Sequence, residues 1–162
     1  MNTARYTAGA CSSPVRGIIA GGTGPSNLSS MEFITIASKG NGKEFGNLTS
    51  IRVNMSNGCS NSNRGIFSGG SNPLQNTIDY VTISSLGNAQ DFGDLTQARQ
   101  RPTSASNQTR AVIAGGGNPS SVNTIDFIFI NTTGNAQDFG DLTEATSTKG
   151  ACSDSHGGLG GF

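Results

Sequence analysis

The residue types best suited to chemistry in this 162-residue sequence are three cysteines, one histidine and a few carboxylates. Cys11, Cys59 and Cys152 occupy one position of an internal repeat, where the third copy has Ala105. A position that accepts alanine requires a small apolar side chain, a role that a buried free cysteine fills. Equivalent positions on neighbouring repeats should also lie beyond the Cα separation of about 7 Å that a disulfide allows. We therefore predict that the cysteines pack in the core, in preference to a redox or metal role.

Two other sequence patterns resemble motifs of nucleotide-binding proteins. Asp-Phe-Gly at 91–93 and 138–140 matches the letters of a magnesium-binding triplet, but no catalytic-loop or strand-lysine signature accompanies it. The glycine runs at 21–24, 69–70 and 115–117 lack both a following helix and the Lys-Ser/Thr ending of a phosphate loop. Both patterns recur in phase with the repeat, which favours a structural origin.

Acidic residues in apolar surroundings are the remaining candidates. Asp79 and Asp126, with Glu32 in the corresponding place of the first copy, either bind calcium or accept hydrogen bonds from recurring arginines. We favour the arginines, because a guanidinium fork suits a buried carboxylate. These arginines recur at Arg5, Arg52 and Arg99 and again at Arg16, Arg64 and Arg110. His156 is the only histidine, and its lack of recurring ligand spacing predicts neither a metal site nor a catalytic triad.

The elements that must position these residues come from a repeat of 47 residues. The block GNAQDFGDLT occurs at 87–96 and again at 134–143, and GNGKEFGNLT occurs at 40–49. Self-similarity at such a period is typical of repeat architectures. We divide the single repeat domain, 1–162, into full units at 4–50, 51–97 and 98–144 and a partial fourth unit at 145–162.

Each unit is predicted to contain four short strands and no helix. The first strand is rich in small residues, the second runs from arginine to Gly-Gly, and the third alternates in the period of two that a strand shows. The fourth strand carries one phenylalanine and one leucine. We expect these side chains to be buried between consecutive units, at Phe45, Phe92 and Phe139 and at Leu48, Leu95 and Leu142.

The order of features in a unit resembles the kelch repeat. In unit 3 it reads Arg99, small residues at 104–106, an apolar strand ending in Gly-Gly at 112–116, an acid-bearing strand at 125–127 and Phe139. The usual tryptophan is absent, and the phenylalanine substitutes for it. The Gly-Asn block is not typical of kelch and resembles degenerate kelch-like repeats in structural proteins of tailed phages, marine cyanophages especially. The resemblance implies an all-β fold of β-propeller blades.

Three blades and the first two strands of a fourth do not close a ring, because propellers generally need four to eight blades. The alternatives are an assembly of several copies, burial in a larger complex, or truncation of a longer gene product. A two-fold dimer would supply six complete units and two half units that could cross over to the partner. We favour a partial propeller completed by oligomerisation, in which the tail 145–162 pairs with a neighbouring chain.

Composition narrows the function classes. Ten basic and ten acidic side chains cancel, so no positive field attracts nucleic acid or an anionic membrane. No apolar stretch approaches the ~18 residues of a membrane span, and the first ten residues do not resemble a signal peptide. No candidate residue is unique to one unit, whereas catalysis normally breaks repeat symmetry. We expect neither an enzyme nor a cofactor.

Two function classes follow. The first is a structural protein of a virion, as a fibre, spike or decoration component that contacts copies of itself or other virion proteins. The second is an extracellular or cell-surface binding module for a glycan or protein, using the variable loops 23–30, 71–76 and 117–123. Loops that differ on a constant framework are where binding function tends to lie. The chain has two tyrosines and no tryptophan for sugar stacking, so a glycan ligand ranks second.

Overall fold

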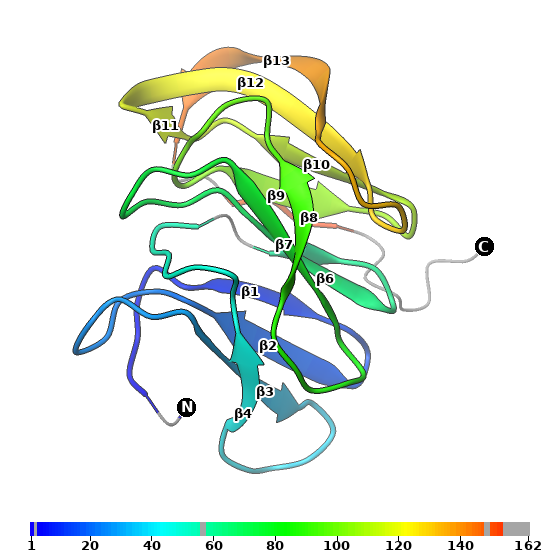
Figure 1. The fold of residues 1–162 in the computed structure, drawn as a ribbon. Helices are drawn as coiled ribbons and strands as arrows, with labels where there is room; N and C mark the ends of the chain where they lie inside the picture. The colour runs from blue at the N-terminus through cyan, green and yellow to red at the C-terminus, as the bar shows by residue number, and fades with distance from the viewer. Residues whose placement is uncertain (2, 56–57, 148–149, 154–162) are drawn as a thin grey trace.

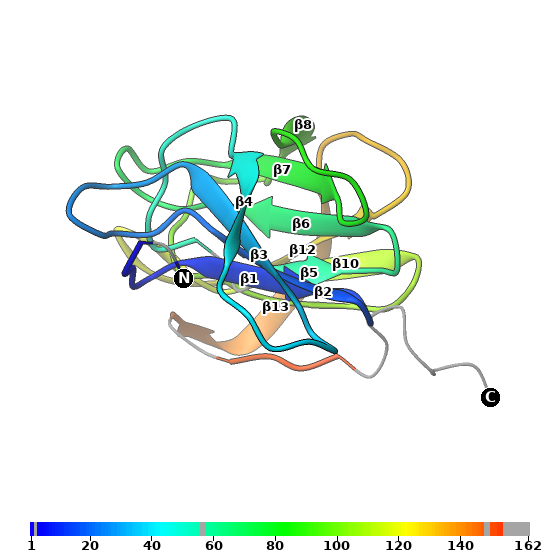
Figure 2. The same ribbon diagram turned by 90° about the horizontal axis from the view of Figure 1, so that it is seen from below.

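The computed structural model describes residues 1, 3–55, 58–147 and 150–153, and these residues form an all-β structure without helices. None of the described segments is therefore a helix that could cross a membrane. Three antiparallel sheets of four main strands follow one another along the chain (Figure 1). Figure 2 looks along this stack from the side of the first sheet.

Each sheet corresponds to one predicted unit, and its strands pair in chain order. Unit 1 contains β1 (Gly9–Ser12), β2 (Arg16–Ala20), β3 (Ser30–Thr35) and β4 (Lys43–Asn47). Unit 2 contains β5 (Cys59–Ser60), β6 (Arg64–Ser68), β7 (Thr77–Thr82) and β8 (Gln90–Asp94). Unit 3 contains β9 (Thr103–Ser106), β10 (Arg110–Ala114), β12 (Ser120–Phe129) and β13 (Gln137–Thr146), and the short β11 (Gly117–Asn118) pairs with β12. The sheets do not close into a ring.

Glycine ends the second strand of every unit for a local reason. Gly21, Gly69 and Gly115 have φ near +60°, in the left-handed region that glycine enters without steric cost. A Cβ on Gly69 would also lie 2.5 Å from the carbonyl oxygen of Arg99. The Gly-Gly pair therefore lets the chain turn while the arginine near the start of the next unit packs against the turn.

A β-bulge recurs where the fourth strand pairs with the third. Ile78 is opposite Gly93 and Asp79 is opposite Asp91, so Phe92 is the extra residue on its strand. A bulge re-aims a side chain at a fixed place in a strand. Equivalent register shifts occur in units 1 and 3, at Phe45 and Phe139.

The core lies between the sheets in two clusters, one at each junction between consecutive units. The first cluster joins Ile18 and Phe45 of unit 1 to Phe67 and Ile83 of unit 2. The second joins side chains of units 2 and 3 in the same manner, among them Ile66, Phe92, Ile113 and Ile130.

Unit 3 corrects one expectation. Phe45 and Phe92 are each 3% exposed, and Leu48 and Leu95 are buried, but Phe139 is 54% exposed. Leu142 is only half-buried. The prediction that Phe139 is buried between consecutive units is wrong for the single chain, because no further sheet follows unit 3 in the described part of the chain. Burial of this position requires the next unit as well as its own.

We expect Phe92→Ala to lower the free energy of unfolding by about 3–5 kcal/mol, because it removes a buried ring and leaves a cavity. Phe129→Ala is the matched control, since Phe129 is 49% exposed in the outer part of unit 3. Urea unfolding followed by circular dichroism measures both variants. Equal losses for the two would contradict the assignment of Phe92 to an inter-unit core.

Candidate functional site

Buried arginine–carboxylate pairs stand at the same place in all three units. Arg52 pairs with Asp79, and both side chains are fully buried. Arg99 lies 3.2 Å from Asp126, again with both side chains fully buried. In unit 1, Arg5 pairs with Glu32 at 2.7 Å. Each arginine begins its unit and each acid lies in the third strand of the same unit. Of the two interpretations of these acids, the structure shows the arginine contact.

A threonine from the preceding unit completes each aspartate site. Thr49 donates its backbone N–H and its hydroxyl to Asp79, at 2.9 and 2.7 Å. Thr96 makes the same two bonds to Asp126, at 3.0 and 2.6 Å. The carboxylate therefore joins the end of one unit to the body of the next.

The surroundings of the arginines explain why they need these acids. Burial lowers the pKa of Arg52, and the neighbouring Asp79 carboxylate opposes that shift. The pKa of Arg99 is lowered by burial in the same way and is supported by Asp126. Arg52 also donates to the carbonyl of Thr77 at 2.9 Å. These polar groups hold the framework and leave the carboxylate oxygens occupied.

The second set of recurring arginines contacts aromatic rings instead of carboxylates. Arg16, Arg64 and Arg110 lie over the rings of Phe33, Tyr80 and Phe127, with the guanidinium carbon 4.8, 4.6 and 4.8 Å from the ring centre. Arg16 also donates to the carbonyl of Ile83 in the next unit, and Arg64 donates to that of Ile130, each at 2.9 Å. This set thus bonds across the junctions, whereas the first set pairs with acids inside a unit.

The cysteines occupy different surroundings. Cys11 and Cys59 are buried free thiols, and Cys152 is an exposed one. Burial raises the pKa of Cys59 to about 12, and burial together with Cys59 raises the pKa of Cys11. Such thiols remain protonated and inert near neutral pH. Among the described residues, no group of three or more His, Cys, Asp or Glu side chains could hold a metal. His156 lies outside the described residues.

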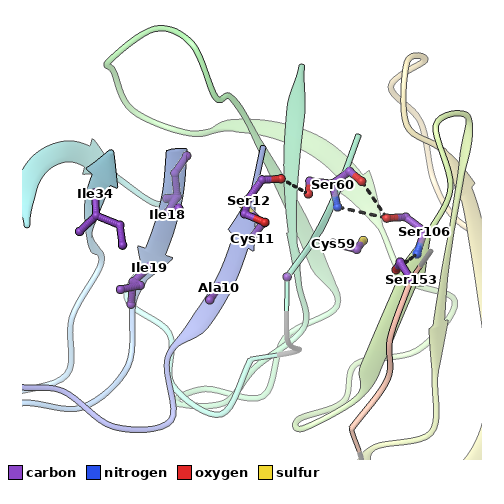
Figure 3. Close-up of a pocket in the computed structure, with 12 residues that line it drawn as sticks. Ala10, Cys11, Ser12, Ile18, Ile19, Ile34, Cys59, Ser60, Ser106 and Ser153 are labelled. Atoms are coloured by element: carbon purple, nitrogen blue, oxygen red, sulfur yellow. Dashed lines mark hydrogen bonds between the residues drawn. The ribbon is translucent and has the colours of Figure 1, made fainter. Parts of the chain in front are cut away.

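A shallow apolar groove of about 390 Å³ is lined mainly by residues of β1, β2, β3 and β5 (Figure 3). Gly17, Ile19 and Ile34 of unit 1 form one side, and Cys59 and Ser60 of unit 2 continue it. Its lining lacks a cluster of charged groups, so it suits an apolar side chain better than a polar substrate.

Serines form a line of hydrogen bonds across the first strands of the three units, β1, β5 and β9, as the dashed lines of Figure 3 show. Ser60 donates its hydroxyl to the Ser12 carbonyl at 2.6 Å, and Ser106 donates to the Ser60 carbonyl at 2.8 Å. The backbone N–H of Ser106 then donates to Ser153 at 2.8 Å.

Ser153 therefore lies where the first strand of a fourth unit would lie. This contact is within its own chain, and the expectation that the tail 145–162 pairs with a neighbouring chain stays a prediction. The remainder of the partial unit, at 154–162, lies outside the described residues.

The two ends of the stack expose what the junctions bury. The unit-1 face consists of Gly17, Ile19, Ile34 and Ile36, and the unit-3 face consists of Val112, Phe127, Phe139 and Leu142. Residues equivalent to the unit-1 face are buried in unit 2, as Gly65, Phe67, Val81 and Ile83. A 47-residue alignment with attention to the outer units could have found both faces.

The variable loops differ in form as well as in sequence. Segments 23–30 and 71–76 connect strands, whereas 117–123 folds as β11 and the start of β12, with Gly117 opposite Ser121. These segments contain no aromatic residue.

No protein-family model matches the chain, and no curated protein matches it.

Removing one partner of a buried ion pair leaves the other charge uncompensated. We expect Asp126→Leu alone to lower the free energy of unfolding by about 3–5 kcal/mol, and the addition of Arg99→Met to recover part of that loss. A double-mutant cycle in urea measures the coupling. Additive losses would show that Arg99 and Asp126 do not stabilise one another.

At pH 8 we expect native protein to react with Ellman's reagent at one thiol per chain, Cys152, because Cys11 and Cys59 are buried. A pKa near 12 leaves roughly one Cys59 in ten thousand as thiolate at that pH. Unfolding should release two further reactive thiols, and Cys152→Ser should abolish only the fast reaction. Three equally fast thiols in native protein would contradict the burial of the pair.

Proposed function

We propose that this protein is a non-enzymatic structural and interaction module that works as part of an assembly. The observation that carries the proposal is the pair of open end faces. Phe139 is 54% exposed where its equivalents are 3% exposed, and Ile36 is 53% exposed where Ile83 is 1% exposed. Exposed apolar faces of this kind mark interaction sites.

The chemistry of the repeat supports a structural role. The recurring acids are held by arginines and threonines, and two of the three cysteines are buried. The same contacts recur from unit to unit, as expected of groups that maintain a framework. A rigid stack of sheets bearing variable loops is a suitable scaffold for a particle surface.

Two finer parts of the proposal rest on sequence resemblance. The kelch-like order of features supports reading the sheets as blades of a partial β-propeller, which an assembly completes. The Gly-Asn block, with its likeness to repeats of phage structural proteins, supports a place in a virion as a fibre, spike or decoration component.

The second candidate is a binding module for a glycan or a protein. It is supported by the variable loops, because they differ on a framework whose contacts repeat. A screen of immobilised glycans with the whole chain separates this candidate from the first. Specific binding that weakens on Asn27→Ala in the first loop, but not on Asn63→Ala, an exposed residue outside the variable loops, would favour the module.

The structural role predicts that the chain is present in purified particles of the virus whose genome encodes it. Quantitative mass spectrometry of particles against the infected lysate measures this, with an abundant non-structural protein of the same genome as control. We expect the chain to be enriched and the control depleted. A chain that is depleted together with the control would overturn the virion proposal.

A further inference from the structure

We infer that two copies of this chain bind head to tail, with the unit-3 face of each copy covering the unit-1 face of the other. The inference rests on the proposed function, because it names the partner that completes the assembly. Its basis is that both faces carry the two halves of a junction that the chain already makes twice within itself.

The apolar halves correspond residue by residue. Ile34 and Ile36 on the unit-1 face are 40% and 53% exposed. Their equivalents in unit 2, Val81 and Ile83, are 3% and 1% exposed because unit 1 covers them. In unit 3, Ile128 and Ile130 are 3% and 0% exposed beneath unit 2.

The opposite half is equally open. Phe45 and Phe92 pack against the following unit and are 3% exposed, whereas Phe139 is 54% exposed. A second copy of unit 1 presents to Phe139 the kinds of side chain that cover the other two rings.

The polar groups of the junction are also present on the two faces, with the arginine donor on the unit-3 face and the carbonyl acceptor on the unit-1 face. Arg16 and Arg64 reach the carbonyls of Ile83 and Ile130 in the following units. Arg110 already stacks on Phe127 in the same manner. The corresponding acceptor is the carbonyl of Ile36, whose own N–H bonds the preceding hairpin as those of Ile83 and Ile130 do.

The outer edge of each unit makes backbone bonds to the next. Gly87 donates to the Phe45 carbonyl at 2.9 Å, and Gly134 donates to the Phe92 carbonyl at 2.8 Å. The side chains of Asn88 and Asn135 accept from the same edges, at 3.0 and 3.1 Å. At a junction between copies, the Phe139 carbonyl on β13 would accept from Gly40, with Asn41 in the place of the two asparagines.

A glycine on β13 is consistent with this approach. A Cβ on Gly46 would lie 2.1 Å from the Gly87 carbonyl oxygen, and one on Gly93 would lie 2.4 Å from that of Gly134. Gly140 has a similar positive φ, of +136°, yet has nothing within 4 Å of its Cβ position. The partner's Gly40 loop is the group that fits this space.

The described residues at the C-terminal end must move for the junction to form. Thr146 accepts from Gly116 where Arg52 accepts from Gly22, and Ser153 lies beside Ser106, so Thr146 and Ser153 stand at the places that Arg5 and Ser12 of a partner would take. Strand β1 is paired with β2 at four positions. The described tail is held less extensively, and we expect it to yield to β1.

Counting units selects the size of the assembly. Two copies supply six sheets, within the four to eight of closed propellers, whereas three copies would supply nine. A closed dimer covers both open faces of both copies.

The test compares three variants of the full chain by light scattering over a range of concentrations. Wild type should weigh twice the 16.5 kDa of the chain, and Ile36→Glu and Phe139→Glu should each shift it to the monomer. Ile51→Glu is the matched control, since Ile51 is 51% exposed but lies on neither face, and it should remain dimeric. Circular dichroism checks that each variant is folded.

Mixing the two monomeric variants tests the head-to-tail arrangement. Each mixed pair retains one intact junction, between the unit-3 face of the Ile36→Glu copy and the unit-1 face of the Phe139→Glu copy, so dimers should reappear. A wild-type monomer, or a mixture that stays monomeric, overturns the inference. A monomer that is nevertheless found in particles would leave the proposed function standing, and a dimer that is absent from particles would overturn the virion role alone.

Discussion

Each of the three described sheets is apolar on both of its faces, so its full burial requires a neighbour on each side. One face of unit 2 packs on unit 1 and the other packs on unit 3, which is why its side chains are the most completely buried. The strand order within a sheet requires no partner, but the hydrophobic gain of folding comes from the junctions. The outer units therefore obtain only half of the cover that the middle unit has.

The polar groups of the junction fix how one sheet lies on the next. Apolar faces alone would tolerate small slides, whereas a carboxylate that accepts from Arg52 of its own unit and from Thr49 of the preceding one has a single suitable position. The arginine of the second strand adds a bond to a carbonyl across the junction. Each contact is short and directional, and together they determine the relation between consecutive sheets.

Periodicity alone made much of this predictable. The 47-residue alignment identified the units, the four strands of each and the buried positions Phe45 and Phe92. It could not separate Phe92 from Phe139, because both lie in the same ten-residue block, GNAQDFGDLT, and only the neighbouring sheet differs. The threonine donors were missed for a related reason, since their acceptors lie 30 residues away in another unit. Local pattern describes a strand, whereas burial and side-chain pairing at a junction depend on two units at once.

The equivalence of the two internal junctions has a consequence for how such a gene can change. A duplication or deletion of one 47-residue step joins a unit end to a unit start of the same kind, so the new boundary inherits the threonine, the arginines and the glycine approach already in place. Changes of another length that fall within a strand would shift these groups out of phase and break several contacts together, whereas the loop before the second strand already differs by one residue between units. Addition or removal of a whole step is therefore the change of length that this pattern of contacts accommodates.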